Sequence, residues 1–271
     1  MDRYLTKRDL YKKIQTLRGH MHLSNLPYPI DLVEYCNHDD QIEIERVPFK
    51  TNGLQGMAVL PDKYGEKDII MLNSKQSSCE SNFYCAHELI HLNIHRDGKG
   101  KTFNCYEKAR PYQDKYLEWQ ANEGAAELIA PYEEILKIIG ARKDKFNNWW
   151  GIEELKSFLC KNFFVSEAFV KYRLESLKYE IYQYLNGVDF NRIKVLSQFQ
   201  LSKLGFTVDS LNDRERVLLE DIFKESPMPY EDMLITATHA HYRNEILEIQ
   251  YEAVDYDIGL RKAEEKWLYD V

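Results

Sequence analysis

The stretch His87-Glu88-Leu89-Ile90-His91 constrains the fold more than any other part of the chain. Residues four apart on an α-helix project from the same face, one turn above the other. On a helix, His87 and His91 can therefore offer two imidazole nitrogens to a single metal ion. Glu88 would lie beside them, where it can reach a water on that ion but not easily the ion itself. This is the arrangement that a zinc hydrolase needs.

The residues around this motif predict a buried helix between Ser77 and His95. Ser77 followed by Glu80 forms a capping box, which starts a helix where one is needed. Apolar side chains then recur at helical spacing, at Phe83, Ala86, Ile90 and Ile94. Two buried histidines and a buried glutamate would each need a partner. We therefore favour a metal site over two core histidines that bond backbone groups.

Two histidines leave a catalytic zinc ion short of one protein ligand. Glu118 is the preferred third ligand, because Asn122 shares its helix face one turn later and can orient a ligating histidine through its second nitrogen. Small residues in the same predicted helix, 114–130, would allow the close helix approach that a bridging ion demands. Glu123 and Glu127 are less favoured as ligands, and both are expected on a solvated helix face.

Other candidate ligands are disfavoured by their positions. Asp97 stands where the extended pattern H-E-x-x-H-x-x-G-x-x-H has its last ligand, but that pattern needs glycine at the position of Ile94. His95 lies two turns beyond His87 and is expected to support the site or cap the helix, where a partly protonated imidazole is favoured. Cys85, two residues before His87, points off the histidine face.

The pattern of apolar residues predicts an α+β fold. Three short strands precede the motif helix, at residues 41–49, 54–60 and 68–72, and a loop should follow Gly100. We expect a small three-stranded sheet packed on a zincin-like helix core, followed by a mainly helical C-terminal region. The strand at 54–60 could bind extended substrate by edge addition, although a strand more often serves only its sheet.

The predicted domain organisation has three parts. Residues 1–150 form a zincin-like metallopeptidase domain with an N-terminal helix, and residues 151–187 form a helical closing segment. Residues 188–271 form an acidic, mainly helical region with no assigned role, interrupted at Pro227 and Pro229. The pair His239 and His241 in this region is expected to be incidental.

Composition excludes several classes of protein. The chain is 44% hydrophobic and 30% charged, which is typical of globular proteins. No run of 18 apolar residues exists, so we expect no membrane span. The five cysteines are odd in number and contain no C-x-x-C pair, and the start of the chain lacks an apolar signal core. These features favour reduced thiols in a cytoplasm.

The negative charge of the chain is concentrated at its C-terminal end. Leu211 to Val271 contains 15 acidic and 7 basic residues, and so accounts for the whole net charge of −8. This balance opposes non-specific nucleic-acid binding, which needs a basic patch. A DNA-reading helix pair at 152–185 is also disfavoured, because glutamates there cancel the lysines. Direct DNA binding is therefore not expected.

These motifs together resemble the ImmA/IrrE family of zinc metallopeptidases. The resemblance rests on Ala86 to His91, on Glu118 with Asn122, and on the run Leu128 to Pro131. Three further segments agree with it: the strand pair at 54–57 and 69–73, the histidine at 95, and the helical segment 164–174. The likeness covers about residues 25–178, and residues 188–271 match nothing familiar.

The resemblance implies a cytoplasmic endopeptidase, often encoded on phages or mobile elements, that cleaves a helix-turn-helix repressor. It implies zinc ligation by His87, His91 and Glu118, with Glu88 as the general base. The segment before residue 25 is too short for a helix-turn-helix domain, so the repressor should be a separate protein. In one departure, Ala130 stands where the family often has methionine.

One alternative function stays open at this point. The chain is then a binding module that sequesters a regulator without cutting it, with zinc structural or vestigial. The residue that stabilises the oxyanion is not identified, and Tyr84, Tyr112 and Tyr116 are candidates without support.

Overall fold

The computed structural model describes residues 5–61, 66–96, 100–107 and 110–225. Contacts divide the chain into two compact units, Met1–Asn212 and Asp213–Val271. The segment 226–271 lies outside the described residues, and with it Pro227, Pro229, His239, His241 and most of the acidic end of the chain. Asp97 also lies outside them.

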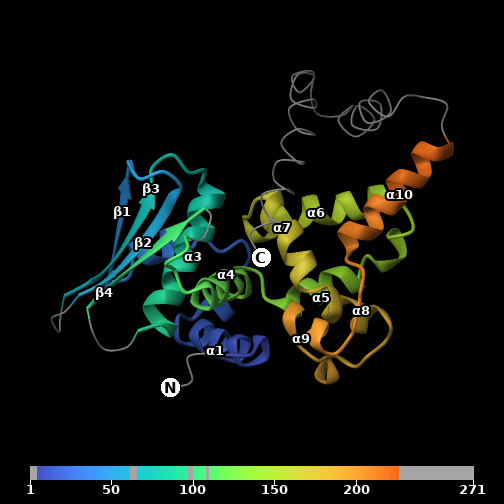
Figure 1. The fold of residues 1–271 in the computed structure, drawn as a ribbon, viewed down its shortest axis with the longest axis horizontal. Helices are drawn as coiled ribbons and strands as arrows, with labels where there is room; N and C mark the ends of the chain where they lie inside the picture. Colours follow the sequence, from blue (N-terminus) through green and yellow to red (C-terminus); the bar gives the residue numbers. More distant parts are fainter. Residues whose placement is uncertain (1–4, 62–65, 97–99, 108–109, 226–271) are drawn as a thin grey trace. The chain divides into compact units, whose positions relative to one another are not determined.

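A four-stranded mixed sheet lies at one side of the first unit (Figure 1). Its strands are β1 (Ile42–Val47), β2 (Leu54–Leu60), β3 (Asp68–Asn73) and β4 (Lys101–Tyr106), in the order β1-β3-β2-β4. The β1–β3 pair is parallel, whereas β2 pairs antiparallel with both β3 and β4. The predicted fold class, α+β, is confirmed.

The predicted three-stranded sheet was wrong, because β4 occupies the segment expected to be a loop. This strand has only two buried side chains, Phe103 and Cys105, between polar neighbours. β2 is not the edge strand that could have bound extended substrate. β2 is hydrogen-bonded on both sides, so its backbone groups are already paired and cannot receive a peptide.

The motif helix packs on the sheet, and other helices pack around it. α3 (Ser78–Ile94) lies across β2, β3 and β4, and α4 (Lys115–Ile129) packs on α3. α1 (Lys7–His20) also packs on α4, and α2 (Leu32–Asn37) contacts β1 and α3. β2 alternates buried and half-buried residues, as expected of a sheet covered on one face.

The small residues of α4 let three helices approach closely, as predicted. A Cβ added at Gly124 would lie 3.2 Å from Cγ1 of Ile90 on α3 and 3.3 Å from Cδ1 of Ile14 on α1. Ala121 and Ala125 are fully buried in the same interface. A larger residue at these positions would push α4 away from α3, and with it the side chain of Glu118.

The rest of the first unit is mainly helical. It contains α5 (Tyr132–Gly140), α6 (Trp149–Phe163), α7 (Glu167–Ser176), α8 (Lys178–Leu185) and α9 (Gln198–Lys203), with single 3-10 turns at Leu23–Asn25, Lys143–Lys145 and Phe190–Arg192. α10 (Leu211–Glu225) begins at the end of this unit. None of the described helices combines the length and the apolarity that crossing a bilayer requires.

Candidate metal centre

The local sequence fixes where α3 begins and so which side chains its inner face presents. Ser77 is the N-cap, and its hydroxyl accepts from the backbone N–H of Glu80 while the Glu80 carboxylate accepts from Ser77 N–H. One helical turn separates His87 from His91, and both are fully buried. Their Nε2 atoms lie 3.1 Å apart.

Glu118 reaches the two histidines from the first turn of α4. The side chain of Asp114 caps this helix by accepting from the backbone N–H groups of its first turn. The Glu118 carboxylate oxygens lie 3.5 Å from Nε2 of His87 and 3.9 Å from Nε2 of His91. The side chain of Glu118 is 15% exposed, whereas the two imidazoles are sealed from solvent.

These distances fit one tetrahedral ion. Ligand atoms about 2.1 Å from a zinc ion lie about 3.4 Å from one another in a tetrahedron. The three separations among His87, His91 and Glu118 span 3.1 to 3.9 Å, and the group falls within 4.8 Å overall. The donor set of two imidazoles and one carboxylate is one that zinc accepts in catalytic sites.

Each histidine is held by a partner on its other ring nitrogen. Nδ1 of His87 lies 2.9 Å from Oδ1 of Asn122, which can only accept, so this nitrogen carries a proton. Burial lowers the pKa of His87, but Cys105, Glu118 and Glu88 outweigh it and raise the pKa well above its usual value, so a metal ion would displace a proton from Nε2.

Nδ1 of His91 lies 2.8 Å from Nδ1 of His95. Burial, together with the nearby His87, lowers the pKa of His91 well below its usual value, which keeps the ring neutral.

The imidazole of His95 is neutral and not partly protonated as expected. It is the C-cap residue of α3, but burial, with the charges of His87 and Lys101, lowers its pKa to about 4. The imidazole is therefore neutral near pH 7, because its burial outweighs the attraction of the helix C-terminus. A neutral His95 can accept the proton of His91 Nδ1 and so orient that ring.

Glu88 is buried at the same place without a hydrogen-bond partner for either carboxylate oxygen. Burial raises its pKa to about 8, against the opposing charge of His87. The carboxylate lies over Gly56 of β2, where an added Cβ would come within 2.5 Å of Oε1. An unpaired buried carboxyl group is costly to a fold, which makes Glu88 a candidate for a chemical role.

Two residues of β4 complete the surroundings of the site, and the sequence arguments missed both. Phe103 stacks on the ring of His91 with centroids 4.3 Å apart. The Cys105 thiol lies within 4.8 Å of ligand atoms of His87 and Glu88. The alternation of Phe103 and Cys105 between polar residues was the one available signal, since side chains two apart in a strand share a face.

Glu123 and Glu127 do not lie on a solvated face, contrary to expectation. They are 2% and 6% exposed and both pair with Arg173 of α7, which is itself 1% exposed. Lys7 of α1 pairs with Glu180 of α8 close by, at 3.0 Å. We call these five residues the buried charge cluster. It is formed by residues far apart in the sequence, so no local pattern reveals it.

The charge cluster has three carboxylates and two cations. Burial, only partly offset by Arg173, raises the pKa of Glu127 to about 7, and burial also raises the pKa of Glu180. Burial acts against Glu123 too, but Lys7 and Arg173 lower its pKa overall. Hydroxyl groups of Ser176, Tyr172 and Tyr11 also donate to Glu123.

The remaining sequence candidates lie elsewhere. Cys85 is buried with its Sγ 3.9 Å from Sγ of Cys36, away from the histidines' ligand group as expected. The hydroxyl of Tyr116 donates to the backbone carbonyl of Leu5, and Tyr112 is 73% exposed. Neither observation supports Tyr112 or Tyr116 as the hydrogen-bond donor to the oxyanion.

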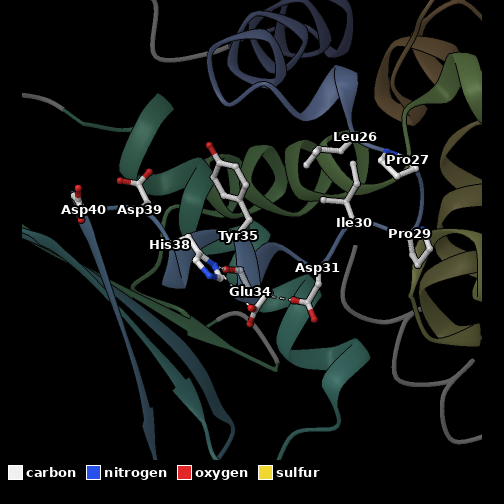
Figure 2. A pocket seen from close by; sticks show the side chains of 10 residues that line it. All are labelled: Leu26, Pro27, Pro29, Ile30, Asp31, Glu34, Tyr35, His38, Asp39 and Asp40. Atoms are coloured by element: carbon white, nitrogen blue, oxygen red, sulfur yellow. Dashed lines mark hydrogen bonds and ion pairs between the residues drawn. The ribbon is translucent and has the colours of Figure 1, made fainter.

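A separate cavity of about 720 Å³ lies at the start of α2 (Figure 2). Prolines and acidic side chains line it, among them Pro27, Pro29, Asp31, Glu34 and Asp40. None of the residues of the histidine site contributes to its walls. The cavity and the buried site between α3, α4 and the sheet are therefore separate.

The segment that contains this site matches a known family. The family model described as the IrrE N-terminal-like domain matches residues 20–175, which is more than half of the chain. No curated protein matches the chain at a significant level. The matched segment includes α3, α4 and the whole sheet. The chain belongs to the ImmA/IrrE family and carries the metallopeptidase-like domain of that family.

Proposed function

We propose that this protein is a zinc-dependent endopeptidase that cleaves a helix-turn-helix transcriptional repressor encoded by a phage or mobile element. The observation that carries the catalytic part is the convergence of His87, His91 and Glu118, with the unpaired carboxylate of Glu88 beside them. The pairing of a motif helix with a glutamate from the next helix is a zincin-like arrangement. The repressor as substrate is supported by the family resemblance.

In this proposal His87, His91 and Glu118 hold the ion. Zinc, when bound, supplies Lewis-acid polarisation of the scissile carbonyl and lowers the pKa of a water molecule towards about 7. Asn122 fixes the tautomer and ring orientation of His87 through the 2.9 Å contact. His95 and Phe103 do the same for His91, one at its Nδ1 and the other on its ring face.

Glu88 is the general base. Burial alone would keep Glu88 largely protonated at pH 7, and the charge of a bound ion would favour its ionised form. In that form its carboxylate would take the proton of the attacking water and deliver it to the nitrogen of the leaving amine. No other hydrogen bond holds the carboxylate oxygens, so they are available for both transfers. Burial makes the site dry, and dryness strengthens each electrostatic contact with the reacting atoms.

A cytoplasmic location forms part of the proposal. All five cysteines are free thiols, and Cys36 and Cys85 stay unbonded although their sulfur atoms are 3.9 Å apart. Free, closely spaced thiols are typical of proteins kept in a reducing compartment.

The test combines metal analysis with a cleavage assay. The purified full chain is analysed for zinc and incubated with helix-turn-helix proteins encoded near its own gene, with and without a chelator. A zinc-dependent fragment is expected. Glu88→Gln should keep the zinc and lower the cleavage rate by about 100-fold or more, while the control Glu45→Gln, at an exposed position of β1, should cleave normally.

The same experiment separates the alternative function. A module that only sequesters its partner would release no fragment, and Glu88→Gln would still act fully on the regulator. That outcome would overturn the catalytic proposal.

A further inference from the structure

We propose that the open edge of β1, together with the acidic cavity at the start of α2, is a docking site for an extended segment of a partner protein that carries lysine or arginine. This inference goes beyond the proposed function and does not depend on a bound metal ion. The cavity shares no residue with the histidine site, so a docked segment leaves that site free.

β1 is the outermost strand on one side of the sheet (Figure 1). Among the described residues, β3 is the one strand that pairs with it. The register of that pair runs without interruption from Ile42 to Val47, so no bulge turns the edge away from a partner. The strand also contains no proline. A regular edge of this kind is what an added strand needs.

The backbone groups that face outwards follow from the ladder. The carbonyl oxygens of Gln41 and Val47 accept from backbone N–H groups at the start of β3 and just beyond its end, both at 3.0 Å. Backbone groups alternate in direction along a strand, so those of the odd-numbered residues face β3. Those of Ile44 and Arg46 face the open side. Within the described part of the chain, no backbone hydrogen bond occupies them.

The cavity lies beside the start of this strand. Asp39 and Asp40, which line it, directly precede β1 in the sequence (Figure 2). The carbonyl oxygen of Asp39 accepts from the backbone N–H of Ile42 at 3.3 Å, which ties the cavity wall to the strand. A strand rises about 3.3 Å per residue, so a segment that pairs with Ile44 reaches Asp40 after about 13 Å, or about four residues.

The charge of the cavity determines which segment fits. None of its lining residues is lysine or arginine, whereas four are acidic: Asp31, Glu34, Asp39 and Asp40. Pro29 and Tyr35 add apolar surface, on which the aliphatic stem of a lysine or arginine can lie while its charged end meets a carboxylate. A second copy of this chain would bring like charges together, which is costly. A cationic partner is therefore favoured over self-association.

Charge also orients the segment along the strand. Arg46 lies near the end of β1 that is distant from Asp40, and its guanidinium donates to the hydroxyl of Ser81 at 3.0 Å. Cations in the docked segment would be repelled by Arg46 and attracted by Asp40. They are therefore expected at one end of the segment, beyond the residues that pair with β1.

The experiment measures the binding of fluorescein-labelled peptides to the purified full chain by fluorescence anisotropy. Two basic probes have a core of alternating threonine and valine, with two lysines at the N-terminal end in one and at the C-terminal end in the other. An acidic probe has glutamates instead of lysines, and a blocked probe carries N-methyl groups throughout its core. At least one basic probe should bind, less tightly as salt rises. The acidic and blocked probes should bind about tenfold or more weakly.

Two double variants remove the same charge at different places. Glu34→Gln with Asp40→Asn, on the cavity wall, should weaken binding of the basic probe by roughly tenfold, because two partly exposed ion pairs are lost. Glu154→Gln with Asp189→Asn, at side chains 48% and 77% exposed elsewhere, should leave it unchanged. Ile44→Pro removes an outward N–H without touching a bond to β3, and it should abolish binding.

Each result bears on the proposal directly. If neither basic probe bound the wild-type chain, the docking site would be refuted. Equal binding of the acidic probe, or equal effects of the two double variants, would refute the role of the cavity. Equal binding of the blocked probe would refute strand pairing, and it decides that point even if Ile44→Pro does not fold. The catalytic proposal is judged separately, by zinc-dependent cleavage.

Discussion

Gly56 of β2 lies directly beneath the carboxylate of Glu88 of α3. The closest approach is so tight that a methyl group at position 56 would stand 2.5 Å from Oε1 of Glu88. The space for the general base is thus created by a missing side chain on the neighbouring strand.

Gly56→Ala should therefore displace the Glu88 carboxylate while leaving the metal ligands in place. A shift of about 1 Å in a catalytic group can cost about 100-fold in rate. The zinc content should be unchanged and the cleavage rate should fall by that order. Gly19→Ala is the matched control, because a Cβ there meets nothing within 4 Å. Normal cleavage by Gly56→Ala would show that Glu88 needs no such space.

Asn122→Ala should weaken metal binding without removing a ligand. Oδ1 of Asn122 is the acceptor that holds Nδ1 of His87 at 2.9 Å. Loss of such a partner typically costs about 10- to 100-fold in metal affinity. Competition with a fluorescent zinc chelator measures this affinity. The exposed Asn147→Ala serves as the control, and equal affinities for the two variants would contradict the orienting role.

Arg173→Met should strongly destabilise the fold. The guanidinium is 1% exposed, pairs with Glu123 and Glu127, and donates to the carbonyl oxygen of Ala130 at 3.0 Å. Removing one partner of a buried ion pair costs about 3–5 kcal/mol, since the remaining carboxylates are left uncompensated. Urea unfolding measures the change. Arg192→Met, at a side chain 81% exposed, should alter stability little. Similar midpoints for both variants would refute the prediction.

Glu127→Gln should reduce the fall in stability as the pH rises to about 7. Burial raises the pKa of Glu127 from 4.5 to about 7, so the folded protein holds a proton that the unfolded chain releases. This contribution is complete below the unfolded value and is lost as the pH rises through the folded one. It amounts to about 3 kcal/mol at 1.4 kcal/mol per pKa unit.

Urea unfolding between about pH 4.5 and 7 checks the Glu127 prediction, because that is the interval over which the proton is lost. The Glu154 side chain is 48% exposed, so the surface variant Glu154→Gln should show the wild-type dependence of the unfolding free energy on pH. If the unfolding free energy of Glu127→Gln changed with pH as it does in the wild-type protein, another group would be responsible for that change.

The motif helix could be predicted from the sequence because its determinants are local. Ser77 and Glu80 set its first turn, and the spacing of His87 and His91 sets its metal-facing side. The approach of Glu118 and Asn122 was also predictable, because a metal chemistry that needs one more ligand limits the choice on the next helix.

What the sequence arguments missed depends on long-range pairing. β4 forms because β2 offers it a ladder, and its own two buried side chains are too few to predict a strand. Glu127 is buried because Arg173, 46 residues later, accompanies it. A charged residue on a helix is normally solvated, so only the folded arrangement reveals the exception.

The buried charge cluster includes residues on both sides of the segment that matches the family model. The family match ends at residues 20 and 175, yet Lys7 and Glu180, which are 1% and 0% exposed, lie outside it and pair with each other. Tyr11, also outside, donates to Glu123 and accepts from Arg173 at 2.6 Å. A fragment trimmed to the shared segment would leave Arg173 and Glu123 without that partner. The contacts of the cluster therefore extend from Lys7 to Leu196, whose backbone N–H donates to Glu180, which is well beyond the segment shared with the family at both ends.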